Sequence, residues 1–479
     1  MIVDPLASRE ASDSSDAVSK MQQAIYASAV SGFKDVFRGE IIEPTHTTYD
    51  AARVVWNGMV DRRPALIARC ADTQDVISAI GFAREHDLVI AARSGGHSVA
   101  GFSTCDDGIL IDMANMRGVQ VDPAGRVARV NGGALLRELD LSAQEFGLAC
   151  PVGVVSHTGV AGLTLGGGMG RLQRRYGLTI DNLLAVDLVT ADGRVIRVDD
   201  ESNPDLFWGM RGAGANFGVV TSFEFRLHPV GPTVTHGFLV YTIDRSHEVA
   251  SRFAEFGATG PDEVMPTLTF GTVGSDHPWS ELEGQPVAMV QVTHCGEIDG
   301  ADRDLEPLRV ERPFADTIEP KEYLGVQGAN DAELAWGKRF YMKGGFANAI
   351  THELIDACLD AIESAPGRCG IGFWAQGGAM GRIPVDAAAF TGRDAAFWIG
   401  MEAFWDDPAK DDEFRGWGRR AWDALKPFTA GGHYVNDVIE TGESVVRSIY
   451  GDAKYERLVR LKRTYDPDNV FRLNQNIVP

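Results

Sequence analysis

Paired-cysteine spacing is missing from this chain of 479 residues, which contains only six cysteines. No two of them form the C-x-x-C pattern of zinc and redox sites. The histidines and carboxylates show no H-E-x-x-H motif and no clustered ligand spacing. We therefore expect buried thiols and no metal site. The six cysteines are Cys70, Cys105, Cys150, Cys295, Cys358 and Cys369.

Long apolar runs and an excess of basic residues are absent as well. No apolar run reaches the roughly 18 residues that suggest a membrane-spanning helix. Residues 1–20 are acidic and serine-rich and show no secretion signal, so we expect a cytoplasmic protein. The net charge of −22, from 45 basic and 67 acidic side chains, opposes binding to nucleic acid or an anionic membrane. A small molecule is the expected partner, and the oligomeric state stays open.

The common nucleotide-binding fingerprints are also missing. No glycine loop ends in the Gly-Lys-Ser or Gly-Lys-Thr of a phosphate-binding loop. The nearest approach to the dinucleotide fingerprint, residues 212–218, misses its last glycine by one place and precedes a strand. The sequence therefore argues against a Rossmann domain and against nucleotide triphosphate chemistry.

Glycine is concentrated in two segments. The first, Arg93-Ser94-Gly95-Gly96-His97-Ser98, follows an apolar run, and the second extends from Gly159 to Gly170. Without Cβ atoms, paired glycines let backbone N–H groups converge on phosphate oxygens. A histidine at the end of such a loop can reach the cofactor itself. The alternative for the first loop alone is a tight turn with an incidental surface histidine.

Five motifs occur in order along the chain. They are Arg93-Ser94-Gly95-Gly96-His97, Gly166-Gly167-Gly168-Met169-Gly170, Tyr176-Gly177-Leu178-Thr179-Ile180-Asp181-Asn182, Arg211-Gly212-Ala213-Gly214-Ala215-Asn216-Phe217-Gly218-Val219-Val220-Thr221 and Phe471-Arg472-Leu473-Asn474-Gln475-Asn476-Ile477. Together they resemble the berberine bridge enzyme-like FAD-linked oxidases of the vanillyl-alcohol oxidase (PCMH-type FAD-binding) superfamily, bacterial members above all. The resemblance covers about residues 45–230 and 430–479, whereas the middle third matches only loosely.

The resemblance implies an α+β fold with a two-subdomain FAD-binding domain and a substrate domain whose sheet is covered by helices on one face. Apolar periodicity predicts a β-α-β unit between residues 65 and 111 and a turn at Asp192-Gly193 between two strands. We expect an N-terminal helical extension over 1–38, the FAD-binding domain over 39–229 and the substrate domain over 230–429. Residues 430–479 are expected to return to the FAD-binding domain.

The resemblance also implies FAD as cofactor, bound covalently through a ring nitrogen of His97 to the 8α-methyl group of the flavin. A neutral imidazole is a competent nucleophile near pH 7. For Asn436, Asn474 and Asn476, a turn or capping role is the alternative. The expected cofactor-binding residues are Arg93, Ser94, Gly95, Gly96, His97, Ser98, Gly159, Gly162, Gly166, Gly167, Gly168, Gly170, Asp181, Asn182, Gly218, Val219, Asn436, Asn474 and Asn476.

Two departures from the family pattern are informative. Many relatives carry a second tether from a cysteine, but that position falls on Val155, and Cys150 lies five residues too early. We therefore expect a single covalent bond, although a loop shift at Cys150 could restore the second. Met169 occupies a position where many relatives have tyrosine. An apolar wall there favours a hydrophobic or aromatic substrate over a sugar.

For catalysis, the resemblance places the Tyr-x-Asn motif beside the flavin, so Tyr434 is the expected base. An ordinary tyrosine has a pKa of about 10 and needs a nearby cation to act as a base near neutrality. Lys343 is the first candidate for that cation and Arg339 the second. Gln376 is expected to point from the substrate sheet toward the bound molecule. For Tyr434, Lys343 and Arg339, a solvated or helix-packing side chain is the alternative, and for Gln376 it is a plain surface residue of a strand.

These features predict an FAD-dependent oxidase that moves a hydride from an aromatic or polycyclic alcohol, phenol or amine to the tethered flavin. Molecular oxygen would then reoxidise the flavin and yield hydrogen peroxide. Such a reaction suits a step of secondary metabolism or the breakdown of a heterocycle. The alternatives are a carbohydrate or simple alcohol oxidase or dehydrogenase of the same fold, and a flavin-binding protein without catalysis.

Overall fold

The computed structural model describes residues 27–274 and 279–479, and most of the expected N-terminal extension lies outside them. Within the described part, residues 27–36 are helical. Val30 and Phe33 of this helix, and Phe37 directly after it, are buried in a shared apolar cluster. The ring of Phe33 stacks on Phe82 with 4.5 Å between centroids. This helix end is therefore fixed to the first subdomain by aromatic packing.

The first subdomain holds a small sheet in the order β1-β2-β4-β3, in which β1 is antiparallel and the other three strands are parallel. The expected β-α-β unit is present as β2, α3 and β3. Helix α3 begins after Asp72, whose carboxylate accepts the N–H groups of Gln74 and Asp75. The elements are β1 (Glu40–Ile42), α2 (Tyr49–Arg53), β2 (Leu66–Arg69), α3 (Thr73–Glu85), β3 (Ile90–Arg93) and β4 (Ile109–Asp112).

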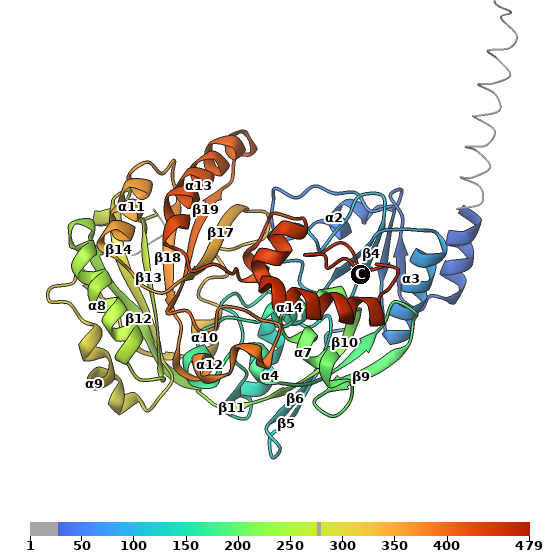
Figure 1. The fold of residues 1–479 in the computed structure, drawn as a ribbon, viewed down its shortest axis with the longest axis horizontal. Coiled ribbons are helices and arrows are strands. Elements are labelled where there is room, and N and C mark those ends of the chain that lie inside the picture. Colours follow the sequence, from blue (N-terminus) through green and yellow to red (C-terminus); the bar gives the residue numbers. More distant parts are fainter. Residues whose placement is uncertain (1–26, 275–278) are drawn as a thin grey trace, which may run out of the picture.

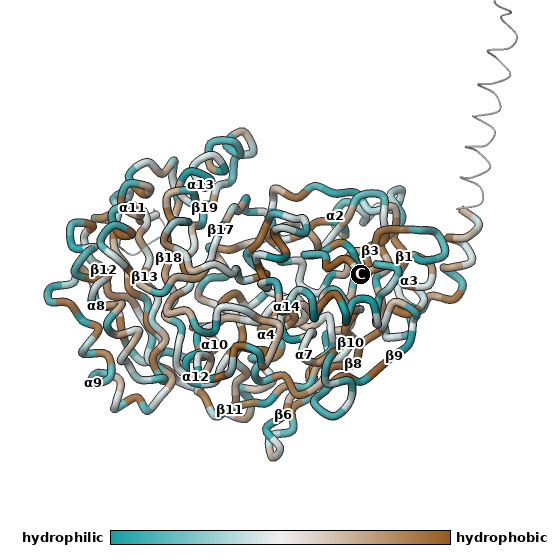
Figure 2. Tube along the Cα trace, in the orientation of Figure 1, coloured by the Kyte–Doolittle hydropathy of each residue, from teal (hydrophilic) through white to brown (hydrophobic). Residues whose placement is uncertain are grey.

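The second subdomain is an antiparallel sheet in the order β5-β6-β10-β8-β9, and β7 pairs with β11 beside it. The turn expected at Asp192-Gly193 joins β8 to β9, with Gly193 at a φ of 82°. Figure 2 shows hydrophobic residues along inner strands such as β8 and β10. The strands are β5 (Val119–Asp122), β6 (Val127–Asn131), β7 (Leu148–Ala149), β8 (Leu183–Val189), β9 (Val195–Asp199), β10 (Val219–Arg226) and β11 (His228–Pro229). The helices are α4 (Leu136–Gln144), α5 (Val160–Gly166), α6 (Gln173–Tyr176) and α7 (Pro204–Ala213).

The third sheet is large and antiparallel, in the order β15-β12-β14-β13-β18-β19-β17, and β16 also pairs with β12. Helices α8, α11 and α13 cover one of its faces (Figure 1). The strands are β12 (Thr233–Thr242), β13 (Val264–Thr272), β14 (Pro286–His294), β15 (Ala315–Asp316), β16 (Glu319–Glu322), β17 (Arg339–Ala347), β18 (Cys369–Ala375) and β19 (Phe397–Trp405). The helices are α8 (Ser246–Thr259), α9 (Ala301–Leu305), α10 (Tyr323–Gln327), α11 (His352–Glu363), α12 (Gly378–Arg382) and α13 (Asp411–Leu425).

Strand β19 shows how this sheet serves two purposes. Phe397, Ile399 and Met401 lie in the apolar core under the helices. Trp398 and Glu402 alternate with them and face a cavity on the other side. The expected α+β fold, with helices over one face of the substrate-domain sheet, is confirmed.

The chain then returns to the first two sheets through α14 (Glu443–Tyr465), which packs against α7 (Figure 1). Lys462 of α14 is fully buried and its ammonium pairs with Asp466 at 2.7 Å. The same ammonium donates to the carbonyls of Asn216 and Phe471. Among the described residues, no helix combines the length and the apolar character needed to cross a membrane.

Replacing Lys462 with Ala should lower the free energy of unfolding by about 3–5 kcal/mol, because Asp466 would stay buried without its cation. Urea-induced unfolding measures the change. Arg463→Ala, at an exposed position on the same helix, is the matched control and should change stability by less than about 0.5 kcal/mol. Equal effects of the two substitutions would contradict a structural role for the Lys462 contacts.

Candidate active site

A cavity of about 420 Å³ is lined by residues of all three sheets and of the C-terminal tail. Its size and its largely apolar wall suit a cofactor together with a small ligand. One end holds the glycine segments, and the other holds aromatic side chains of the large sheet. The predicted site residues that line it are Ser94, Gly95, Gly96, His97, Ser98, Gly159, Gly162, Gly166, Gly218, Val219, Tyr434, Asn436 and Asn474.

The two glycine segments meet backbone to backbone at Gly95 and Gly159. A Cβ on Gly95 would lie 2.1 Å from the nitrogen of Gly159, and a Cβ on Gly159 would lie 2.2 Å from the nitrogen of Gly95. Any side chain at either position would separate the segments, since such distances fall inside van der Waals contact. Glycine is therefore required on both sides to close this wall of the cavity.

Arg93 supports the loop from behind and does not line the cavity. Its guanidinium pairs with the buried carboxylate of Asp112 at 2.8 Å. It also donates to the carbonyls of Ala52 and Val54. Arg93 is therefore not the wall residue that a cofactor contact requires: its side chain anchors the end of β3, which leads into the His97 loop.

His97 lies between an aromatic ring and a second histidine. Its ring stacks on Trp56 with 4.8 Å between centroids and 15° between planes. Its Nε2 lies 2.7 Å from Nδ1 of His157. Burial, and to a smaller extent His157, lowers the pKa of His97 to about 3. His97 is therefore neutral near pH 7, and within the described part of the chain its Nδ1 has no hydrogen bond.

His157 is not among the expected site residues, because a lone histidine near the cofactor segment is more often a packing residue than a catalyst, yet the structure places it beside His97. Burial lowers its pKa as well, although Asp331 opposes the shift by its charge and through a backbone hydrogen bond. Two neutral rings can share one proton between Nε2 of His97 and Nδ1 of His157. The only available signal was its place in the segment just before α5, because no family motif includes it.

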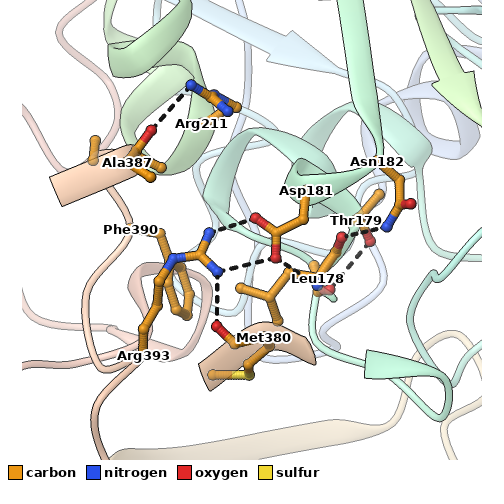
Figure 3. A network of polar contacts seen from close by, with 12 residues as sticks. Leu178, Thr179, Asp181, Asn182, Arg211, Met380, Ala387, Phe390 and Arg393 are labelled. Carbon is orange, nitrogen blue, oxygen red and sulfur yellow. Dashed lines mark hydrogen bonds and ion pairs between the residues drawn. The ribbon is translucent and has the colours of Figure 1, made fainter. Parts of the chain in front are cut away.

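Asp181 and Asn182 have structural contacts in place of the expected cofactor contacts, as neither lines the cavity. The Asp181 carboxylate accepts both terminal nitrogens of Arg393, at 2.5 and 3.0 Å, and both side chains are buried (Figure 3). Asn182 donates to the carbonyls of Tyr176 and Leu178. The Asp181–Arg393 ion pair joins the FAD-binding half to the loop before β19.

Four further expected cofactor contacts also lie behind the cavity wall. Gly168 donates its N–H to the Tyr434 hydroxyl at 3.1 Å. A Cβ on Gly170 would lie 1.8 Å from the carbonyl oxygen of Val152, so this glycine allows close backbone packing. Gly167, at a φ of 139°, and Asn476 complete the group that does not line the cavity.

Tyr434 is buried at the junction of the glycine run and the substrate side. Its hydroxyl oxygen accepts hydrogen bonds from the Gly168 N–H and from Asn436 Nδ2 at 2.9 Å. Burial and the charge of Asp437 outweigh these donors and raise the pKa of Tyr434 to about 12. The phenol therefore stays protonated near pH 7, which disfavours the expected role as base and favours that of a hydrogen-bond donor.

The cations expected to assist Tyr434 are directed elsewhere. Lys343 alternates with the cavity-lining Met342 on β17, so its side chain faces away, and it pairs with Glu440. Arg339 forms a two-bonded ion pair with Asp411. Neither belongs to the cavity wall.

Gln376 is buried outside the cavity as well. Its side-chain oxygen accepts Nε2 of Gln173 at 3.5 Å, and its own amide donates to the carbonyl of Trp374. The carbonyl of Gln376 accepts Arg174, a residue that follows the second glycine segment. Gln376 therefore joins the two halves of the protein and does not point toward a bound molecule.

The two departures from the family pattern have clear positions. Val155 lines the cavity at the place of the second tether. Cys150 is fully buried in the apolar core of the second subdomain and does not line the cavity. Burial also raises the pKa of its thiol well above the usual value. Met169 contributes apolar surface beside Tyr434, as expected.

The substrate side combines aromatic rings with two acids. Sequence reasoning missed Glu402 of β19 and Asp437, which both line the cavity. They belong to the parts of the chain where no motif singles out an acid. The surrounding wall is formed by Trp56, Leu334, Phe340, Met342, Trp374 and Trp398.

These residues fit the FAD that the sequence predicts. Gly162 lines the cavity and has open space where a Cβ would stand, which leaves room against the backbone. At the C-terminal tail, the side-chain oxygens of Asn474 and Gln475 are buried and have no hydrogen-bond partner in the described part of the chain, and both residues line the cavity. Unpaired acceptors of this kind suit the hydroxyl and N–H groups of a polar cofactor. The described residues contain no group of three potential ligands that could hold a metal ion.

Comparison with known proteins agrees with this geometry. Residues 64–199 match the model of an FAD binding domain, and residues 433–478 match the model described as "Berberine and berberine like". The chain is 33% identical to (R)-6-hydroxynicotine oxidase of Paenarthrobacter nicotinovorans, over 92% of this chain and 97% of the relative. It belongs to the berberine bridge enzyme-like FAD-linked oxidoreductases. The family identity makes the protein an FAD-dependent enzyme.

Solved structures place this oxidoreductase in the same fold. The crystal structure of 6-hydroxy-D-nicotine oxidase from Arthrobacter nicotinovorans superposes with a TM-score of 0.83 at 31% identity, covering 92% of this chain and 98% of that one. A single-residue variant of berberine bridge enzyme, described as a reticuline dehydrogenase, gives 0.84 at 21% identity, covering 94% and 99%. The second similarity shows the fold alone.

Asp181→Ala should lower the free energy of unfolding by about 3–5 kcal/mol, because Arg393 would remain buried without its partner. The folded variant should keep the flavin content of the wild type, since Asp181 does not line the cavity. Urea unfolding and the ratio of flavin to protein absorbance measure the two effects. Asp205→Ala, which removes an exposed pair with Arg457, is the control and should cost less than about 1 kcal/mol. Flavin loss from folded Asp181→Ala would restore the cofactor role.

Proposed function

We propose that this oxidoreductase is an oxidase of an aromatic or polycyclic small molecule, with FAD attached covalently through His97. The observation that carries this proposal is a neutral His97, with its Nδ1 unbonded within the described residues, in the same cavity as an aromatic substrate wall. The relative named (R)-6-hydroxynicotine oxidase supports a substrate that contains a nitrogen heterocycle. The flavin, when bound, accepts a hydride from the substrate and passes the electrons to oxygen, which yields hydrogen peroxide.

In this proposal the chain positions the His97 imidazole for attachment, provides an apolar pocket for the substrate and orients one hydrogen bond. His157 holds Nε2 of His97, which leaves Nδ1 to form the tether. The ring of Trp56 fixes the plane of the imidazole. On the substrate side, Met169 and Phe340 exclude water and favour a flat, apolar molecule over a sugar.

Tyr434 orients the reacting group in this proposal. Its oxygen already accepts two hydrogen bonds, so its own proton is available to a substrate oxygen or nitrogen. The position of Val155 at the cavity and of Cys150 in the core supports a single covalent bond.

Acid precipitation tests the attachment. Wild-type protein should retain yellow flavin in the pellet, whereas His97→Ala should release all of it into the supernatant, as read from absorbance spectra. His352→Ala, at an exposed position far along the chain, should behave like the wild type. Flavin in the wild-type supernatant would overturn the covalent bond and leave a noncovalent flavoenzyme; folded protein without any flavin would overturn the proposed function.

The pH dependence of attachment follows from the lowered pKa of His97. A histidine with the ordinary pKa of about 6.5 would become protonated as the pH falls through that value, and its ring nitrogen would no longer be nucleophilic. With a pKa of about 3, His97 stays neutral from pH 8 to pH 5. Flavin-free protein mixed with FAD should therefore form covalent adduct to the same extent at both values, measured as flavin in the acid pellet. A fall centred between pH 6 and pH 7 would contradict this environment.

A further inference from the structure

Two acids share the substrate end of the cavity. Glu402 lies on the cavity side of β19, directly across from Met342 on the neighbouring strand. Asp437 ends the short turn Val435–Asp437 that follows Tyr434. Both carboxyl groups lie deep in the protein, yet both residues keep partial exposure because they border the cavity.

Among the residues that the structure describes, neither acid has a cation to balance it. In the described ranges, no lysine, arginine or histidine acts on either carboxyl through a hydrogen bond or an opposite charge. Nearby cations are engaged elsewhere, since Lys343 pairs with Glu440 and Arg368 pairs with Glu333. The charges that face the two carboxyls are of the same sign, because Glu333 acts on Glu402 and Glu402 acts on Asp437.

The pKa values reflect this arrangement. Burial, followed by Glu333, raises the pKa of Glu402 to about 7. Burial, followed by Glu402, raises the pKa of Asp437 well above its usual value. Two uncompensated buried acids destabilise a fold, so their presence at a cavity indicates a use.

A fixed donor points to the same place. Trp398 is only 5% exposed, and among the described residues its indole N–H has no hydrogen-bond partner. Trp398 lies close enough to Asp437 to oppose the rise of its pKa in part, although its N–H does not complete a hydrogen bond within the described residues. The ring lies over two paired glycines, since a Cβ on Gly344 or Gly400 would come within 2.8 or 2.2 Å of it. Glycine at positions 344 and 400 therefore leaves the space that the Trp398 ring occupies at the cavity.

The remaining wall is aromatic. Trp374 stands nearly perpendicular to Trp398, with 6.2 Å between centroids and 78° between planes. Trp56, Phe340 and Tyr434 line the same cavity. The faces of such rings attract a cation, and most strongly where water is excluded.

We propose that Glu402 and Asp437 form a subsite for the positively charged nitrogen of an amine substrate, enclosed by Trp398 and its aromatic neighbours. This proposal rests on the proposed oxidase function and specifies its substrate class. An ammonium group would supply the charge that both acids lack, and it could be drawn to the ring faces as well. The hydroxyl groups of a sugar or an alcohol would leave the buried negative charge uncompensated.

The test uses the flavin-loaded enzyme and two probes of the same shape. Benzyltrimethylammonium carries a permanent charge, and neopentylbenzene is its neutral carbon analogue. Binding is titrated at pH 8 from the change in flavin absorbance, so that no turnover is needed. We expect a Kd for the cation at least about tenfold below that for the neutral probe.

Substitutions separate the charge from the shape. Asp437→Asn and Glu402→Gln should each raise the Kd of the cation about tenfold or more and change that of neopentylbenzene by less than about threefold. Glu440→Gln, three residues after Asp437 and outside the cavity wall, is the matched control and should change neither by more than about twofold. Melting temperatures of the two amide variants should equal or exceed that of the wild type, because each removes a buried like charge.

Cation binding should also strengthen from pH 6 to pH 9. Glu402, whose pKa is raised to about 7, ionises within this range, and the charged form is the one that attracts the probe. Tyr434 stays protonated through it. Equal affinity for both probes, or cation binding unchanged in both amide variants, would overturn the subsite. If the protein retains flavin that an alcohol or sugar reduces, but does not bind the cation, the subsite is wrong and the proposed oxidase function stands. If the protein binds the cation but holds no flavin, the proposed oxidase function is wrong and the cation site stands.

Discussion

The backbone contact between Gly95 and Gly159 is the constraint on which the rest of the site depends. Gly95 lies in the loop after β3 of the first subdomain, and Gly159 lies directly before α5 of the second. The backbone nitrogen of each residue occupies the space that a Cβ on the other would need. This contact closes the seam between the first two subdomains. It also places His97 beside His157, since both histidines lie two residues from the touching glycines. The glycine-lined side of the cavity and the position of His97 thus follow from one steric requirement.

The acids of this structure fall into two groups, those that have a cationic partner and those that have none within the described residues. Asp112, Asp181 and Asp466 each have an arginine or lysine partner, and these pairs hold strand ends, domains and the C-terminal helix. Glu402 and Asp437 are partly exposed at the cavity that they border, and they have no such partner within the described residues. Removing one partner of a buried pair is strongly destabilising, so pairing is expected wherever charge serves the fold. The unpaired acids therefore mark the place where a ligand supplies the missing charge.

Local backbone requirements made part of the site predictable from sequence. The loop of His97 and the glycines at 95 and 159 are recognisable because few residue types satisfy such geometry. Lys343 shows the limit: on a strand, a shift of one residue reverses the face, and Met342 reaches the cavity in its place. Asp181 shows a second limit. A motif identifies the residue but not its contact, which in this structure is Arg393, 212 positions away in the sequence. Glu402 and Asp437 come together only through the fold.

Strand alternation explains how such a site can change without loss of the fold. On β19, the odd-numbered residues from 397 to 405 belong to the core under the helices, whereas Trp398 and Glu402 face the ligand. Substitution at the even positions alters shape and charge in the cavity, and the core contacts stay intact. The cofactor side has no comparable freedom, because its glycines are fixed by backbone contact. Divergence in substrate is therefore expected to concentrate on the cavity face of the large sheet, where this chain carries its two unpaired acids.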